Sequence, residues 1–223
     1  MNQPRILVVE DEVIVGRDIC QQLQDLGYEP IAHLRTGEEA IVQARQLRPS
    51  LVLMDISLAG GMDGVASAQI IREQLGIPVV FLTAFAGGET LRRAKLADPF
   101  GYIVKPFEER ELHTTVELAL YKHQAEMTLR DSERFRQLLL DSVSEGLYGV
   151  DTDGRCTFVN RAGLLMLGYD REEDLLGRNF HDLVHHTRPD GSPYPAVECR
   201  MCQPLVTGDT FDDKAKLPSP CKA

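Results

Sequence analysis

The chain has 223 residues, with 34 acidic and 24 basic side chains, and therefore a formal net charge of −10. Its length indicates one or two domains, and 43% hydrophobic with 26% charged residues is an ordinary globular composition. The acidic balance argues against nucleic acid or an anionic membrane surface as a partner, and both parts are acidic when the chain is divided at Asp131. No apolar run approaches the roughly 20 residues of a membrane span. Because the chain also shows no signal-peptide pattern and its five cysteines are scattered, we expect a cytoplasmic protein.

Short apolar runs alternate with helical periodicity over residues 1–122. Strands are predicted over the apolar runs 6–9, 51–54, 79–82 and 101–104 and over the strand-like segment 28–34. Helical spacing is found over 13–26, 38–47, 65–75, 89–96 and from 108 onward. Five buried strands that alternate with five helices predict an α/β fold in which both faces of a parallel sheet are covered. Such sheets carry their chemistry at the carboxyl ends of the strands.

Polar side chains stand at the ends of four of these predicted strands. They are Glu10 and Asp11 after the first strand, Asp55 after the third, Thr83 after the fourth and Lys105 after the fifth. Because the carboxyl ends of parallel strands meet at one edge, we expect these five groups to converge. Three adjacent carboxylates repel one another unless a cation neutralises them, and all-oxygen ligands favour Mg²⁺. Taken singly, the carboxylates could instead be helix caps, in which case Glu10 and Asp11 would only begin the first helix.

This set of groups suits phosphoryl transfer, which is mostly positioning and neutralisation of the phosphoryl oxygens. Asp55 is the candidate phosphoacceptor, because it follows a wholly apolar strand and precedes a turn, and a carboxylate can hold a phosphoryl group covalently. The expected metal ligands are the carboxylates of Glu10, Asp11 and Asp55 and the backbone carbonyl of Ser57. The groups expected to contact the phosphoryl oxygens are Lys105, Thr83 and the backbone N–H of Ala84.

Five runs of residues around these positions resemble the response-regulator receiver domain of two-component signalling. The runs are 6–12, 53–56, 62–64, 81–84 and 102–107, and the resemblance covers residues 4 to about 123. It implies a flavodoxin-like, doubly wound five-stranded fold and Mg²⁺-dependent phosphorylation of Asp55 by a histidine kinase or phosphotransfer protein. It also implies a switch in which Thr83 moves toward the phosphate and Tyr102 changes rotamer. The pair Lys105-Pro106 is typical of the family, and we expect its peptide bond to be cis.

The stretch after Asp55 departs from the family pattern. The family commonly runs through a proline to a glycine turn, whereas residues 56–64 contain no proline and one extra glycine. We therefore expect a longer and looser loop, which leaves the metal ligands in place and the lifetime of the phosphoryl group open.

The helical segment that begins at 108 is longer than closing the sheet requires. Helix formers continue to about Met127, and Asp131-Ser132 predicts a helix restart because both residues cap well. Positions 118, 121, 125, 128, 132, 135 and 139 follow coiled-coil spacing, and five of the seven are apolar. This segment is either a dimerisation helix or an ordinary last helix that overhangs. A homodimer would form through residues 108–130 or through the face of the fourth helix, fifth strand and fifth helix.

The third part of the chain is predicted to contain strands at 146–150 and 156–159 joined by a turn at 151–154, helices at 161–167 and 172–176, and a loop at 188–193. The runs 132–139, 145–147, 150–154, 158–162, 167–169 and 176–179 resemble the start of a PAS sensor domain, and the resemblance covers residues 132–211. The family folds as a five-stranded antiparallel sheet with small helices on one face. The resemblance therefore implies a partial α+β module without its three closing strands, which we expect to be unstable alone or completed by a partner. Residues 212–223 have the composition of a disordered tail.

The ligand of this second module stays open. A light-driven flavin adduct is not expected, because Phe180 stands where the light-sensing PAS class has its reactive cysteine. His181, His185 and His186 are candidate haem ligands, although histidines in a polar segment are usually solvated. Cys199-x-x-Cys202, together with His185 and His186, has the residue types of a zinc site, or the two thiols are merely neighbours.

The sequence thus predicts a receiver domain joined by a helical connector at 124–131 to a PAS-like module, acting in a phosphorelay. It is not expected to be an enzyme, apart from self-dephosphorylation. One alternative is the N-terminal fragment of a hybrid histidine kinase, but the chain has neither the kinase's phosphorylated-histidine motif nor its ATP-binding motifs. The other alternative is a binding adaptor that works without phosphorylation. No helix-turn-helix pattern supports a role in transcription.

Overall fold

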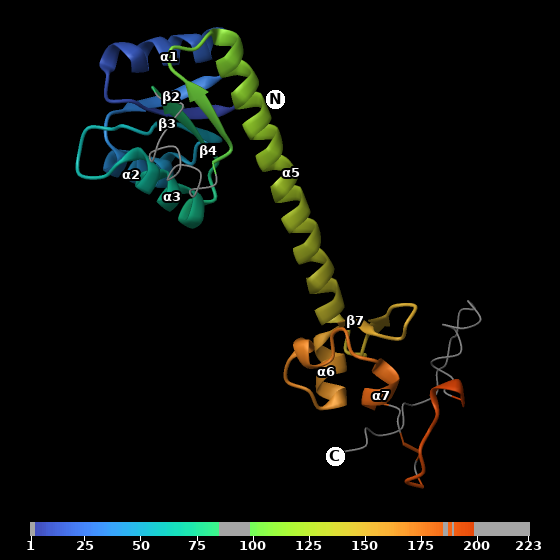
Figure 1. The fold of residues 1–223 in the computed structure, drawn as a ribbon. Helices are drawn as coiled ribbons and strands as arrows, with labels where there is room; N and C mark the ends of the chain where they lie inside the picture. The colour runs from blue at the N-terminus through green and yellow to red at the C-terminus, as the bar shows by residue number, and fades with distance from the viewer. Residues whose placement is uncertain (1–2, 85–98, 185–186, 189, 199–223) are drawn as a thin grey trace. The chain divides into compact units, whose positions relative to one another are not determined.

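The computed structural model describes residues 3–84, 99–184, 187–188 and 190–198, and it divides into two compact units, Met1–Leu129 and Arg130–Ala223 (Figure 1). Several predictions lie outside the described residues. They are the helix at 89–96, the thiol pair Cys199 and Cys202, the histidines His185 and His186, and the tail at 212–223.

The first unit is built on a five-stranded parallel sheet, as predicted. Its strands are β1 (Arg5–Val9), β2 (Glu29–Leu34), β3 (Leu51–Asp55), β4 (Val79–Thr83) and β5 (Gly101–Val104). The strand order is β2-β1-β3-β4-β5, and every neighbouring pair is parallel. The order of the strands reverses between β1 and β3, which makes the carboxyl ends of these two strands the switch point of a doubly wound sheet.

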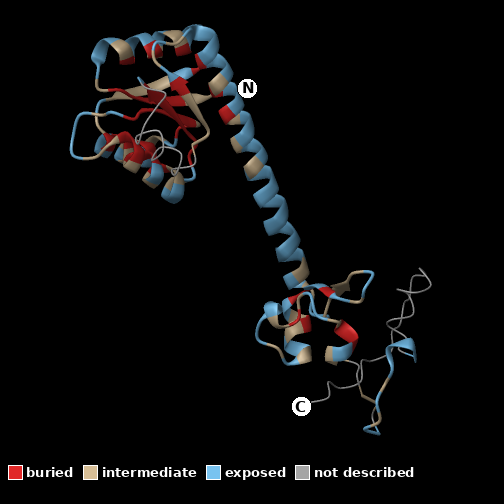
Figure 2. Cartoon of the chain, viewed as in Figure 1, coloured by how far each residue is buried: buried red, intermediate tan, exposed pale blue. Residues whose placement is uncertain are grey.

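Helices α1 (Val13–Asp25), α2 (Gly37–Leu47), α3 (Gly64–Leu75) and the start of α5 (Glu109–Ser142) cover the sheet. Successive side chains of a strand point to opposite faces, so β1 contributes to two separate cores. Leu7 and Val9 pack with residues of α2 and α3, whereas Ile6 and Val8 pack with residues of α1 and α5. Figure 2 shows the buried residues concentrated in the strands and in the sheet-facing sides of these helices.

Helix α5 is continuous over 34 residues. Its first part buries Leu112, Val116 and Ala119 against the sheet, and the helix then continues with an exposed surface. The predicted restart at Asp131-Ser132 is wrong, because both residues lie inside the helix. Capping residues end a helix only where the backbone ladder is interrupted, and strong helix formers on both sides carry it through here. Although α5 is long, none of the described helices combines the length and apolar character that crossing a membrane requires.

The second unit contains the predicted hairpin and a small core. Strands β6 (Tyr148–Val150) and β7 (Cys156–Val159) are antiparallel and are followed by α6 (Arg161–Leu167). The helix predicted at 172–176 is only the 3-10 turn η1 (Glu172–Asp174), and the short elements α7 (Phe180–Val184) and η2 (Ala196–Glu198) were not predicted. The core consists of Cys156, Val159, Leu175 and Phe180, with the ring of Tyr148 stacked on Phe180 at 4.1 Å between centroids.

Asn160 ties the C-terminal end of α5 to this core. Its side chain is almost completely buried and caps α6 by accepting a hydrogen bond from the Gly163 N–H at 2.8 Å. The same oxygen accepts from the Leu147 N–H at 2.8 Å. The amide nitrogen donates to the carbonyls of Leu140 and Glu145, at 2.9 and 3.0 Å. One side chain therefore satisfies backbone groups from the last turn of α5, the residues before β6, and the start of α6.

Candidate functional site

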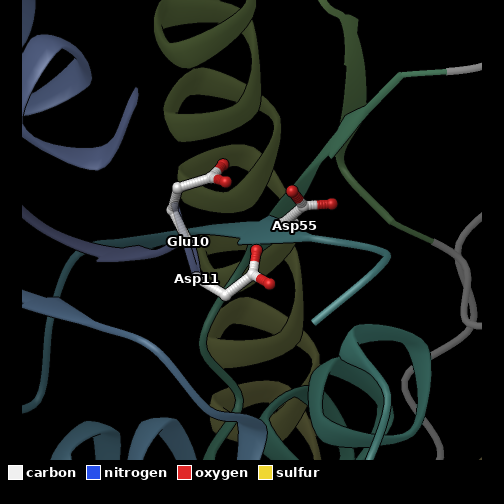
Figure 3. A group of neighbouring side chains, drawn as sticks. All are labelled: Glu10, Asp11 and Asp55. Atoms are coloured by element: carbon white, nitrogen blue, oxygen red, sulfur yellow. The ribbon is translucent and has the colours of Figure 1, made fainter. Parts of the chain in front are cut away.

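Three carboxylates gather at the carboxyl edge of the parallel sheet (Figure 3). Glu10 and Asp11 come directly after β1, and Asp55 is the last residue of the adjacent strand β3. One oxygen of each carboxylate lies within 4.8 Å of the others. Glu10 is completely buried and Asp55 is 6% exposed, so neither charge is well solvated. The expected convergence of these residues is therefore present in the structure.

Lys105 joins two of these carboxylates. Its ammonium nitrogen donates to Glu10 Oε2 and to Asp55 Oδ2, both at 2.5 Å. The backbone N–H of Lys105 donates to the Thr83 carbonyl at 2.7 Å, which continues the pairing of β4 and β5 and holds the lysine at this edge. The peptide bond between Lys105 and Pro106 is cis, as expected.

Burial and pairing shift the pKa values of Glu10 and Lys105. Burial raises the pKa of Glu10 above its ordinary value, and the nearby Lys105 offsets this only in part. Burial lowers the pKa of Lys105, but its hydrogen bonds and attraction to Asp55 and Glu10 outweigh burial, so the pKa is raised overall. The lysine is therefore a fixed positive charge at neutral pH.

The chain around Asp55 explains the last glycine of the loop that follows it. The Ser57 N–H donates to Asp55 Oδ1 at 2.9 Å and orients the carboxylate. A Cβ atom on Gly64 would lie 1.8 Å from the Asp55 carbonyl oxygen, so only glycine fits where α3 begins against the end of β3. Asp63 caps α3 by accepting a hydrogen bond from a backbone N–H of its first turn. The Asp63-Gly64 pair thus fixes the loop against the candidate acceptor.

The structure also places the other predicted residues that it describes. Thr83 ends β4 and is buried, whereas Ala84 and Ser57 are exposed. Tyr102 lies on β5 and is partly buried, with its ring 6.0 Å from that of Phe81. In the second unit, His181 is buried, and its Nε2 lies 2.8 Å from the Tyr194 carbonyl. The role of each of these residues stays a prediction.

Two residues that the sequence reasoning missed contact the backbone of the acidic pair. His33 Nε2 lies 2.8 Å from the Glu10 carbonyl oxygen, and Arg35 Nε donates to the Asp11 carbonyl at 3.2 Å. Both come from the carboxyl end of β2 or directly after it. The strand-end rule that identified the acidic residues also applies to β2, so it would have pointed to this pair.

Comparison with known proteins agrees with this geometry. Residues 6–117 match the response regulator receiver domain, and residues 134–201 match the PAS fold. The chain belongs to the response regulator receiver family. The receiver domain accounts for the parallel sheet and its acidic edge, and the PAS match covers the hairpin and short helices of the second unit.

The receiver domain is also what this chain shares with individual relatives. The transcriptional regulatory protein PdtaR of Mycobacterium tuberculosis is 34% identical over 129 residues, which is 58% of this chain and 62% of that protein. The phyllosphere-induced regulator PhyR of Methylorubrum extorquens is 31% identical over 121 residues, 54% of this chain and 45% of PhyR. The signal receiver domain of a modulated diguanylate cyclase from Desulfovibrio desulfuricans is 38% identical, with a TM-score of 0.54 over 56% of this chain and 99% of that domain. The chain thus spans less than two thirds of the curated relatives that it matches.

Proposed function

We propose that the receiver domain accepts a phosphoryl group on Asp55, in a Mg²⁺-dependent reaction, from a histidine kinase or phosphotransfer protein. The observation that carries this proposal is the direct contact between Lys105 and Asp55. The lysine ammonium lies 2.5 Å from an Asp55 oxygen, inside a cluster of three carboxylates. A carboxylate in this setting can act as the nucleophile, while the lysine provides a fixed positive charge for phosphoryl oxygens. The chain's own role is thus that of an acceptor with self-dephosphorylation, and not of a kinase.

The donor set suits a divalent metal ion. Glu10, Asp11 and Asp55 would hold Mg²⁺ together with the backbone carbonyl of Ser57, since carboxylate and carbonyl oxygens are the ligands that Mg²⁺ prefers. When bound, the ion supplies neutralisation of the negative charge that develops on the phosphoryl oxygens.

The phosphorylated state would be read by the two predicted switch residues. Thr83 is buried at the end of β4, and its carbonyl accepts the Lys105 N–H, so it lies next to the residue that would grip the phosphoryl group. The Ala84 N–H would add a further donor to these oxygens. Tyr102 packs on the apolar cluster of β4, from which a change of rotamer would alter the surface of β5.

We further propose that α5 passes this change toward the PAS-like module at 132–211, with residues 124–131 as the connector between it and a receiver domain at 4–123. The two compact units meet in sequence at Leu129 and Arg130, which supports a boundary within this connector. We place the protein in the cytoplasm because its composition is acidic and its five cysteines are scattered.

The exposed side of α5 favours a homodimer as the working assembly. Its coiled-coil positions include Leu118, Tyr121, Phe135 and Leu139, each more than half exposed. In a parallel pair of helices, the residue before one core position faces the residue five places later on the partner helix. Two of the four flanking pairs are oppositely charged, Glu117 with Lys122 and Asp131 with Arg136, and no pair carries like charges.

Phosphorylation of the full chain by acetyl phosphate tests this function. With Mg²⁺ we expect the mass of one phosphoryl group to be added, and we expect none with EDTA or in the variant Asp55→Asn. Asp63→Asn is the matched control, because asparagine caps α3 as well as aspartate does and the phosphoacceptor is untouched. A wild-type chain that binds Mg²⁺ and gains no mass would contradict the proposal and leave the adaptor alternative.

A further inference from the structure

The backbone of Glu10 is held by β2 through two hydrogen bonds. The Glu10 N–H donates to the Leu34 carbonyl at 2.9 Å, and the Glu10 carbonyl lies 2.8 Å from His33 Nε2. A carbonyl oxygen only accepts, so Nε2 of His33 carries the hydrogen in this contact. The imidazole therefore fixes the peptide plane that joins Glu10 to Asp11, because that plane is rigid.

Helix α1 leaves room for the imidazole at one position. A Cβ atom on Gly16 would lie 2.0 Å from His33 Nε2 and 2.4 Å from Cε1, so the ring occupies the space that any side chain at position 16 would need. Gly16 is buried in the first turns of α1, where glycine costs about 1 kcal/mol relative to alanine. The absence of a side chain there is explained by the histidine that fills its place.

The orientation of this peptide matters because two candidate metal ligands leave the backbone on either side of it. Glu10 is completely buried, so its side chain has little freedom to compensate for a rotated backbone. Arg35 adds a hydrogen bond to the next carbonyl, that of Asp11, at 3.2 Å, but it is exposed. The orientation of the buried Glu10 carbonyl therefore depends on His33.

We propose that His33 is a positioning residue of the Mg²⁺ site, and that glycine is needed at position 16 to leave space for the imidazole ring. This inference rests on the proposed function, since it takes Glu10 and Asp11 as metal ligands. His33 does not touch the metal or the phosphoryl group. It holds the backbone from which both carboxylates reach the site.

Mg²⁺ binding to the full chain, measured by isothermal titration calorimetry, tests the role of His33. We expect His33→Ala to weaken Mg²⁺ binding about tenfold, the range seen when an outer partner of a metal ligand is lost. His33→Gln should retain affinity within about threefold, since its amide nitrogen reaches as far as Nε2 and also donates. His113→Ala is the control and should bind Mg²⁺ like the wild type, because it removes a histidine bonded to Tyr28, which stands before the amino end of β2.

A double substitution tests whether Gly16 acts by leaving space for the ring of His33. Gly16→Ala alone should weaken Mg²⁺ binding as His33→Ala does, because the methyl group displaces the ring. In the His33→Ala background the same change should cost nothing further, since no ring is left to displace. Equal losses from Gly16→Ala in both backgrounds would overturn the pairing of these two residues.

Phosphorylation rates separate positioning from a general loss of structure. For His33→Ala we expect the Mg²⁺ concentration that gives half the maximal rate to rise about tenfold, with the rate largely recovered at saturating Mg²⁺. A folded His33→Ala chain with wild-type Mg²⁺ affinity would overturn the role of His33 and leave the proposed function standing. A wild-type chain that binds no Mg²⁺ would overturn both.

Discussion

Lys105 keeps two buried carboxylates in place with one ammonium group. Taking Glu10 and Asp55 out of water is costly, and the cost is met only while the lysine donates to both. The same contact occupies oxygens that a metal ion would use. The lysine and the metal are therefore alternative and partly interchangeable sources of positive charge at this edge.

Replacing this lysine should make the protein depend on metal for stability. We expect Lys105→Met to lower the free energy of unfolding by about 3–5 kcal/mol in EDTA, because two buried carboxylates lose their partner. Saturating Mg²⁺ should restore more stability to the variant than it adds to the wild type. Urea unfolding with and without Mg²⁺ measures both effects, and Arg17→Met, which removes an exposed cation from α1, is the control. An equal Mg²⁺ effect in wild type and Lys105→Met would contradict this account.

At the scale of elements, α5 presents a row of large apolar side chains that are more than half exposed in the part of the chain that the structure describes. We expect the full chain to dimerise, and Phe135→Lys to raise the dissociation constant of the dimer at least about tenfold, since each copy would lose the burial of a phenylalanine. Gln137→Lys adds the same charge on the opposite side of the predicted coiled coil and should change little. Sedimentation equilibrium measures both. A wild-type chain that is monomeric at high micromolar concentration would argue against this seam.

The elements also show where sequence patterns are sufficient. Strands β1, β3 and β4 were predictable because buried parallel strands are continuous apolar runs. Strands β2 and β5 are only partly buried, and they were predictable from their place in the alternation of strands and helices. The continuity of α5 was not, since the capping preference of Asp131 acts only at a helix end. The short helix at Phe180–Val184 has too few residues to show periodicity.

The candidate site divides in the same way. Asp55 and Lys105 were predictable because strand ends converge in every parallel sheet. His33 stands at the end of β2, where the same rule applies, but its bond to a backbone carbonyl leaves no pattern in the sequence. The same holds for Gly16, whose role is to leave space for the ring of His33.

At the scale of the whole molecule, each compact unit has a core of its own, and among the described residues the core of Arg130–Ala223 is much smaller. We expect two unfolding transitions in calorimetry, with the second unit unfolding at the lower temperature. Mg²⁺ should raise the midpoint temperature of the upper transition only, because it binds the folded receiver unit and so stabilises it. Asn160→Ala should lower the midpoint temperature of the lower transition only. The free energy of unfolding of the second unit should fall by about 2–4 kcal/mol, since a helix cap is lost and buried carbonyls lose their donor.

Asn160→Asp refines this experiment. Aspartate keeps the oxygen that accepts from Leu147 and Gly163 but cannot donate to the carbonyls of α5 and of the residues before β6. Its effect should be at least as large as that of Asn160→Ala, because the second carboxylate oxygen would be buried against those two carbonyl oxygens. A single transition that responds to both Mg²⁺ and Asn160 would show that the chain unfolds as one cooperative unit, contrary to this prediction.

The charges at the carboxyl edge also bear on how a phosphodonor approaches. The three carboxylates and Lys105 together carry a formal charge of minus two, on a chain whose net charge is −10. Phosphodonors are themselves anions, so the metal-free protein repels them before any contact is made. A bound divalent cation would cancel these two negative charges and so remove the local repulsion of the phosphodonor. Added salt screens the same repulsion, so the benefit of Mg²⁺ to the encounter rate should be greatest at low ionic strength.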